Sequence, residues 1–310
     1  MEIPTMQVRT RTDTRSRPVL PAPRLEMYSR LAIGAAIALC ALQALAGDRL
    51  LATGGVTQVE GAGGGGLAPW ALIAGTGTEG QVGVTASLTH LRTGGGFALR
   101  AAGLAVGIHN RVELSASTLR FGLSDTVPGQ SIDIDTVGIK VRVAGDAVYD
   151  QDSPWPQIAV GVLWKRNRDF DLIPRALGAT SATGAEIYVA ATKVWLAGIV
   201  GRNLLANATL RATNANQFGI LGFGGPQGTR RKLMPEVSAA LFINDHLAVG
   251  AEFRAKPDNL AAFKEQAASD LFVAWFPAKQ FAVTAAYVNL GNIANKPRQT
   301  GWYLSAQVAF

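Results

Sequence analysis

Residues 301–310 read GWYLSAQVAF, and every second side chain in this run is apolar. Successive side chains of a β-strand point to opposite faces, so this alternation predicts a strand with one apolar face and one polar face. The apolar face holds Trp302, Leu304, Ala306, Val308 and Phe310, and the opposite face holds Tyr303, Ser305 and Gln307. An apolar face that ends in a terminal aromatic residue is typical of a strand that faces lipid in an outer-membrane barrel.

The same alternation recurs along the chain as far back as Gln81. Runs of about ten residues with this period are separated by short clusters of turn residues. They predict twelve strands, near 81–92, 97–108, 111–121, 134–144, 156–166, 185–196, 203–213, 233–243, 246–255, 269–276, 280–290 and 301–310. The alternative is fourteen strands, which requires Leu50–Val59 and Leu67–Gly75 to form two more.

The connections between these strands differ in length at the two edges of the predicted sheet. Short turns, such as 109–110 and 244–245, alternate with connections that are mostly longer, such as 167–184 and 214–232. This order is typical of outer-membrane barrels, and a Greek-key sandwich does not produce it. The sequence therefore predicts an all-β fold, a transmembrane antiparallel up-and-down β-barrel of twelve strands in the outer membrane of a Gram-negative bacterium.

Aromatic and basic residues fit the same geometry. Outer-membrane barrels carry an aromatic girdle at each membrane interface. The expected positions are Trp164, Tyr188, Tyr287 and Trp302 near the rim of long loops, and Trp275, Phe281 and Phe310 near the other rim. Arg100 and Arg120 are the only basic residues on the predicted apolar face, and both fall at the long-loop rim, where lipid phosphates neutralise them. Phe310 is also the expected barrel-end signal.

The chain begins with a pattern typical of a signal peptide, predicted over residues 1–46. Arg30 precedes an apolar core from Leu31 to Leu42, and an Ala-Leu-Ala cleavage site follows at 44–46. Met27 is an alternative start. The only cysteine, Cys40, lies in this segment, so disulfides are not expected in the mature chain.

The rest of the chain divides into two predicted parts. Residues 47–80 are rich in glycine and are expected to form either a strap inside the lumen or the first two strands. Residues 81–310 are expected to form the barrel itself.

Composition argues against several classes of protein. Charged residues make up 16% of the chain and hydrophobic residues 48%, whereas disorder requires low hydrophobicity and high net charge. Only one apolar stretch approaches the ~20 residues of a membrane-spanning helix, and it is the predicted leader. The formal net charge of +7 is not gathered into a basic stripe, so no nucleic-acid partner is expected.

Charged side chains on the polar face are expected to point into the lumen. The basic ones are Lys140, Arg142, Lys165, Lys193, Arg211 and Arg254, and the acidic ones are Glu113, Glu236 and Glu252. Charges that line a pore set its ion preference. The alternative is that these residues cross-link the interior through ion pairs, such as Arg254 with Glu252 or Glu236.

The sequence offers little for catalysis, so no enzyme activity and no catalytic residue are predicted. Acyl transfer in such barrels needs a base within reach of a nucleophile, but alternation points Ser87 and His90 to opposite faces. His109 and His246 belong to short turns. Neither histidine nor cysteine occurs at a spacing that holds a metal, so neither metal nor cofactor is expected.

Several longer strings resemble a known family. They are EGAGGGGLAPWALIAG at 60–75, VGIKVRVAGDAVYDQD at 137–152, LRATNANQFGILGFGG at 210–225, LAVGAEFRAKPDNL at 247–260, and the ending at 286–310. Together with TGGV at 53–56 they are similar to the proteobacterial family known as domain of unknown function 3034, over about residues 48–310. The resemblance implies an outer-membrane location and supplies no activity or catalytic residue.

These observations predict a passive channel or transporter for small polar or anionic solutes. Barrels of ~8 strands are filled by side chains and those of ~16–18 strands hold a water channel, so twelve strands suit a narrow or occluded pore. The alternatives are a closed structural or assembly barrel of the envelope and, less favoured, an outer-membrane enzyme. The expected partners are outer-membrane lipids and the barrel-assembly machinery.

Overall fold

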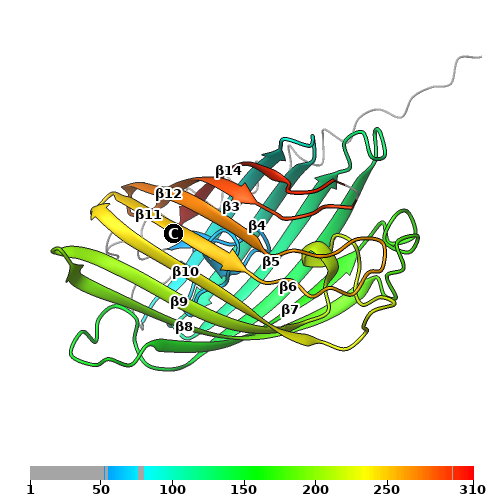
Figure 1. Ribbon diagram of the computed structural model, residues 1–310. Helices are drawn as coiled ribbons and strands as arrows, with labels where there is room; N and C mark the ends of the chain where they lie inside the picture. Colours follow the sequence, from blue (N-terminus) through cyan, green and yellow to red (C-terminus); the bar gives the residue numbers. More distant parts are fainter. Residues whose placement is uncertain (1–51, 53–54, 76–79, 295) are drawn as a thin grey trace, which may run out of the picture. The chain divides into compact units, whose positions relative to one another are not determined.

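The computed structural model describes residues 52, 55–75, 80–294 and 296–310, and the predicted signal peptide lies outside them. Twelve antiparallel strands form a closed barrel (Figure 1). They are β3 (Val82–Thr93), β4 (Ala98–Ile108), β5 (Val112–Gly122), β6 (Ser131–Ala144), β7 (Gln157–Asn167), β8 (Thr183–Ile199), β9 (Arg202–Thr213), β10 (Lys232–Asn244), β11 (Leu247–Arg254), β12 (Ala268–Ala278), β13 (Phe281–Asn289) and β14 (Thr300–Ala309). The predicted fold and the favoured strand number are both confirmed.

The barrel closes between its first and last strands. β14 pairs with β3 in a register that places Leu304 opposite His90. Phe310 continues this pairing, because its backbone N–H donates to the carbonyl of Val84 at 2.8 Å and its carbonyl accepts from the Val84 N–H. Twelve strands therefore complete the ring, and the alternative of fourteen is wrong.

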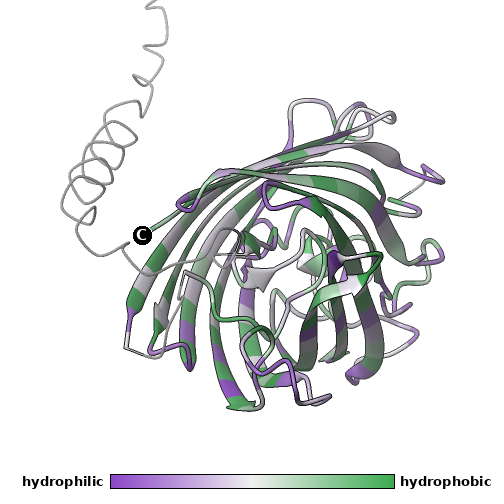
Figure 2. Cartoon of the chain, turned by 90° about the vertical axis from the view of Figure 1, so that its left-hand side faces the viewer, coloured by the Kyte–Doolittle hydropathy of each residue, from purple (hydrophilic) through white to green (hydrophobic). Residues whose placement is uncertain are grey.

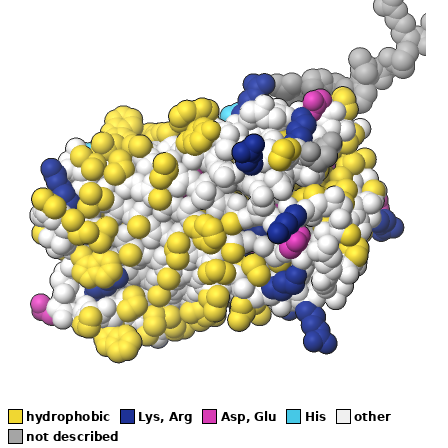
Figure 3. Space-filling view, viewed as in Figure 1, with side chains coloured by type: hydrophobic (Ala, Val, Ile, Leu, Met, Phe, Trp, Pro, Cys, Tyr) yellow, Lys and Arg dark blue, Asp and Glu magenta, His cyan; other side chains and the backbone are white. Residues whose placement is uncertain are grey.

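Each strand follows the alternation read from the sequence, with one face outside the ring and one inside. The outward face carries exposed apolar side chains, and the exposed fraction reaches 67% for Leu88 and 69% for Trp302. In Figure 3 such side chains are spread over the outer surface, while most basic ones lie toward the right-hand end of the view. No helix among the described residues is long and apolar enough to cross a lipid bilayer.

The aromatic residues follow the expected pattern with one exception. Tyr287 and Trp302 pack edge to face on the outside, with ring centroids 5.3 Å apart. Tyr188, which was expected in the same girdle, is buried instead. The expectation rested on the position of Tyr188 along β8. Alternation along this strand turns its side chain inward, against Gly161 and toward the Arg211 guanidinium.

A short segment from before the barrel fills the space inside the ring. Residues 55–75 are almost entirely buried and contain two two-residue strands, β1 (Val56–Thr57) and β2 (Gly63–Gly64), which pair with each other. Figure 2 shows these strands among the inner faces of the barrel strands. We call residues 55–75 the plug segment.

Candidate functional site

The plug segment meets the barrel wall through a cluster of buried charges. We call it the charge hub, and its members come from the plug segment and from five consecutive strands. They are Glu60, Lys165 (β7), Glu186 (β8), Arg211 (β9), Glu236 (β10) and Arg254 (β11), and each is at most 3% exposed. The inward face of each strand supplies these residues, so the alternation that forms the barrel also positions the hub.

Glu60 is the contribution of the plug segment to this hub. Its carboxylate forms a bidentate pair with Arg254, with Nη1–Oε2 at 3.0 Å and Nη2–Oε1 at 3.1 Å. The same carboxylate accepts from Arg211 Nη1 at 3.2 Å and pairs with the Lys165 ammonium. One carboxylate of the plug segment thus engages three basic residues of the wall.

The wall carboxylates complete the hub. Arg211 pairs with Glu236 in a bidentate manner, at 2.5 and 3.1 Å, and with Glu186 at 2.8 Å. Lys165 lies 2.5 Å from Glu186, and Arg254 Nε lies 3.3 Å from Glu236. Three bases therefore face three carboxylates, and the hub as a whole is neutral.

The environment of Glu60 favours its ionised form. Burial alone raises the pKa of a carboxyl group, because the charged form loses its hydration. Here Arg254, Lys165 and Arg211 outweigh burial and hold the pKa of Glu60 well below its usual range. The plug segment therefore keeps a fixed negative charge in the lumen at physiological pH.

A second pair holds the backbone of the plug segment. Glu113 of β5 and Lys140 of β6 are register partners with an Oε2–Nζ distance of 2.8 Å. Glu113 accepts the N–H groups of Gly63 at 2.9 Å and of Ala74 at 2.7 Å, and Lys140 donates to the carbonyls of Gly63 at 2.9 Å and Trp70 at 3.2 Å. One ion pair thus satisfies both donors and acceptors of the plug backbone.

A third contact explains the glycine run of the plug segment. Glu252 of β11 accepts the N–H of Leu67 at 2.8 Å and the hydroxyl of Ser238 at 2.7 Å. A Cβ atom on Gly65 would lie 1.8 Å from Oε1 of Glu252. The backbone approaches this carboxylate so closely that a Cβ atom on residue 65 would displace it from its hydrogen bonds to Leu67 and Ser238, which favours glycine here.

Glu252 also has a carboxylate neighbour that the sequence reading overlooked. Asp270 of β12 is its register partner, and both side chains are buried on the inward face. We assign these two carboxylates no chemistry.

The long-loop end of the lumen is covered by the connection between β9 and β10. It contains a short 3₁₀ segment, η2 (Asn216–Gly219), whose residues are all buried. The ring of Phe218 lies under the Arg254 guanidinium, 4.3 Å away, so this cover contacts the hub. Beside it Lys256 pairs with Glu265 at 2.7 Å and donates to Gln217 at 3.1 Å.

Most of the expected lumen residues meet the plug segment or the hub. This holds for Lys140, Lys165, Arg211, Arg254, Glu113, Glu236 and Glu252. Arg142 lies nearer the short-turn end, where it pairs with Asp146 at 3.4 Å in the following turn.

Lys193 does not take the expected position. Its register partner is Ala206, between the buried lumen-side residues Leu205 and Asn207, so it falls on the outward set of β8. Its ammonium donates to the carbonyl of Asp150 at 2.6 Å and is covered by the turn after β6. The expectation of a lumen-facing Lys193 is wrong, because unbroken alternation from Glu186 to Thr192 on the inward face of β8 puts Lys193 on the outward face.

Two members of the hub were missed from the sequence. Glu186 stands at an inward position of β8 and was recoverable from alternation alone. Glu60 lies in a glycine-rich segment without periodicity, and no local pattern pointed to its partners.

The structure places Ser87 and His90 on opposite faces of β3, so they do not form a catalytic pair. His90 is exposed on the outward face opposite Arg100, while Ser87 is buried on the inward face. His109 occupies a tight turn with positive φ, and His246 Nδ1 lies 2.7 Å from the carbonyl of Phe276. Among the described residues no group of three or more His, Cys, Asp or Glu side chains is placed to hold a metal ion.

Comparison with known proteins identifies one matching family. A family model described as "Protein of unknown function (DUF3034)" matches residues 53–307, which confirms the resemblance read from the sequence. No curated protein matches the chain.

Solved structures of other barrels are similar at low identity. The KdgM porin has a TM-score of 0.47 at 10% identity and covers 73% of this chain and 99% of its own. Omp33 of Acinetobacter baumannii has a TM-score of 0.42 at 11% identity, with 76% and 100% covered. LpxR from Salmonella typhimurium has a TM-score of 0.42 at 10% identity, with 74% and 99% covered. At these values the likeness says nothing about what this chain binds.

Proposed function

The chain belongs to the DUF3034 family, and we propose that it is an outer-membrane channel closed by its own plug segment. The single observation that carries the proposal is the interface between plug segment and wall, which is made of ion pairs and hydrogen bonds around Glu60. In the described state the lumen is occupied, so passage of a solute requires this segment to move.

The outward face supports the membrane location. Leu88, Leu104 and Leu271 are more than half exposed, and apolar side chains exposed over the outer face of a closed barrel favour contact with lipid. Aromatic residues such as Trp275 and Trp302 lie near opposite ends of the strands. Arg100 and Arg120 are exposed near the long-loop rim, where a charge on the lipid face costs only about 0–1 kcal/mol.

The chemistry of the plug interface supports a segment that can leave. Buried ion pairs add little net stability, because desolvation offsets their attraction, and well-packed apolar groups often stabilise as much or more. A permanent plug is served well by apolar packing. When a plug segment held through Glu60, Glu113 and Glu252 leaves its seat, the groups that become exposed are charged or polar, and water solvates them readily.

The balance of lumen charges bears on the solute. The sequence count gave six bases against three acids, but the structure adds Glu60, Glu186 and Asp270 to the buried acids and removes Lys193 from the lumen. The ion-pair interpretation of these residues therefore replaces that of a basic pore. We propose that the opened channel passes small polar solutes with little preference between anions and cations.

Planar-bilayer recording tests this function. Refolded chain from residue 47 onward is expected to be closed, and the same chain without residues 47–75 is expected to conduct in discrete steps. The reversal potential of the deleted chain in a salt gradient is expected near zero, because the wall bases and acids balance.

A closed structural barrel is the second candidate, favoured by the occupied lumen. It predicts no conductance from either chain, so absence of conductance from a folded deletion variant would overturn the channel.

A further inference from the structure

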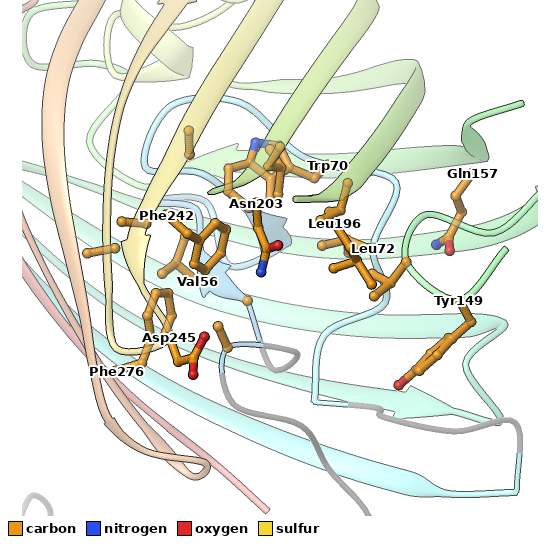
Figure 4. Close-up of a pocket in the computed structure, with 18 of the residues that line it drawn as sticks. Val56, Trp70, Leu72, Tyr149, Gln157, Leu196, Asn203, Phe242, Asp245 and Phe276 are labelled. Atoms are coloured by element: carbon orange, nitrogen blue, oxygen red, sulfur yellow. The ribbon is translucent and has the colours of Figure 1, made fainter. Parts of the chain in front are cut away.

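A second feature of the lumen lies below the plug segment, at the short-turn end. A cavity of about 470 Å³ is bounded above by Trp70 and Leu72 of the plug segment and at the side by Phe242 and Phe276 of the wall. Figure 4 shows Phe242, Phe276 and Leu196 around this space, with Asp245 and Tyr149 toward its mouth. Its volume falls within the range of ~300–1,000 Å³ that is usual for small-molecule sites.

The inward faces of the wall strands change character at this height. Along β10 they run from Glu236 and Ser238 to Ala240 and Phe242. Along β12 they run from Asp270 to Phe272, Ala274 and Phe276. The lumen of a water-filled barrel is polar, so an apolar inner face needs something apolar against it.

The plug segment does not supply all of that surface. Its apolar side chains Val56, Leu72 and Ile73 reach the cavity, yet the space of about 470 Å³ remains between them and the wall. Small side chains create this room, since Ala248 of β11 and Ala274 of β12 are register partners and both line it. An apolar cavity of only about 150 Å³ already binds benzene in a well-studied case.

The charges around the cavity select among apolar ligands. None of the described residues that line it is Lys or Arg, whereas Asp146 and Asp245 stand at the mouth. Asp146 is paired with Arg142 at 3.4 Å, so Asp245 is the carboxylate that a carboxylate ligand would meet there as a like charge. The hydrogen-bonding groups of the lining include the amides of Asn203 and Gln157, the hydroxyl of Tyr149 and the imidazole of His246.

We propose that this cavity is a binding site for a small neutral apolar molecule, aromatic or short aliphatic, with a single hydroxyl-like group. The ring or chain lies among Phe242, Phe276 and Trp70, and the polar group faces the mouth. The site is formed by the wall and the plug segment together, and it is separate from the charge hub.

The test compares 2-naphthol with 2-naphthoate by equilibrium dialysis against the chain from residue 47 in lipid nanodiscs, with empty nanodiscs to measure partition into lipid. Saturable binding of about one 2-naphthol per chain is expected, and 2-naphthoate is expected to bind at least about tenfold more weakly because of the Asp245 carboxylate and the apolar lining. The proposal would be overturned if 2-naphthoate bound as tightly as 2-naphthol or more tightly, or if 2-naphthol showed no saturable binding.

Two variants locate the binding. Ala274→Leu fills the cavity and is expected to weaken the binding of 2-naphthol at least about tenfold. Ala285→Leu makes the same change on the exposed outward face of β13 and is expected to leave this binding unchanged. Asp245→Asn, in an exposed turn, is expected to narrow the discrimination against 2-naphthoate. Binding of 2-naphthol that is identical in Ala274→Leu and wild type, or discrimination unchanged in Asp245→Asn, would place the ligand elsewhere.

Discussion

Glu60 of the plug segment and Arg254 of β11 form a bidentate ion pair across 194 residues of sequence, with N–O distances of 3.0 and 3.1 Å. The two residues belong to different parts of the chain, and only the folded structure brings them together. Because Arg254 also contacts the ring of Phe218 in the cover of the long-loop end, this pair connects the plug segment with the top of the lumen.

The contact between Gly65 of the plug segment and Glu252 of the wall gives a first prediction. Gly65→Ala places a methyl group where Oε1 of Glu252 now lies, since the added Cβ would be 1.8 Å from it. The plug segment is expected to leave its seat while the barrel stays folded. Hydrogen exchange of residues 55–75 is expected to become fast in this variant.

Gly94→Ala is the matched control, because a Cβ there meets only one backbone oxygen at 3.8 Å. It is expected to leave exchange unchanged. Protection of residues 55–75 that survives Gly65→Ala would contradict the described seat.

A second prediction concerns Lys256 and Glu265 under the long loops. Burial lowers the pKa of the Lys256 amine and raises the pKa of the Glu265 carboxyl, although each charge opposes the shift of the other. Glu265→Gln alone leaves the buried Lys256 ammonium without its counter-charge and is expected to lower the free energy of unfolding of the barrel by about 3–5 kcal/mol. The double variant Lys256→Met/Glu265→Gln is expected to stay within about 1 kcal/mol of wild type.

Unfolding in urea, followed by the heat-modifiable gel shift, measures both variants. A double variant as unstable as the single one would show that the pair contributes net stability, against this expectation.

A third prediction tests the barrel end. Phe310 closes the β14–β3 pairing through two hydrogen bonds of 2.8 Å with Val84. Its deletion is expected to reduce assembly into the outer membrane and to leave misfolded periplasmic chain. If the deletion variant showed the same heat-modifiable fraction in the membrane as wild type, Phe310 would not be an assembly signal.

The strands were predictable because each one obeys a local rule. In β5 and β6 the alternation placed Glu113 and Lys140 on the inward face, and register then made them partners. On β8 the prediction failed because the two faces of the strand were exchanged. Tyr188 lies on the inward face and Lys193 on the outward face, as regular alternation along β8 requires.

The plug segment was not predictable in detail for a different reason. β1 and β2 have two residues each, too few to show a period. Between them lies Glu60, whose partners Lys165 and Arg254 are 105 and 194 residues away in sequence. The glycine run at 63–66 was open to interpretation as a strap or loop, and only the position of Glu252 shows why Gly65 is needed.

A fourth prediction follows from the depressed pKa of Glu60. A carboxyl whose pKa is lowered in the docked state stabilises docking fully above its undocked pKa of about 4.3, and this contribution is lost as pH falls below that value. The wild-type channel is therefore expected to stay closed from about pH 8 to about pH 5 and to open only in stronger acid. Bilayer recording across this range checks it, and opening near neutral pH would contradict the assignment of Glu60 as a permanent charge.

The most direct test of the account is the single-channel current of Glu60→Lys in a planar bilayer. This variant puts a fourth base against Lys165, Arg211 and Arg254, so the plug segment is expected to be repelled from the hub. Asp152→Lys makes the same charge change in an exposed turn and serves as control. The account predicts discrete conductance steps for Glu60→Lys and a closed barrel for wild type and Asp152→Lys. A folded Glu60→Lys barrel that stays as closed as wild type would contradict it.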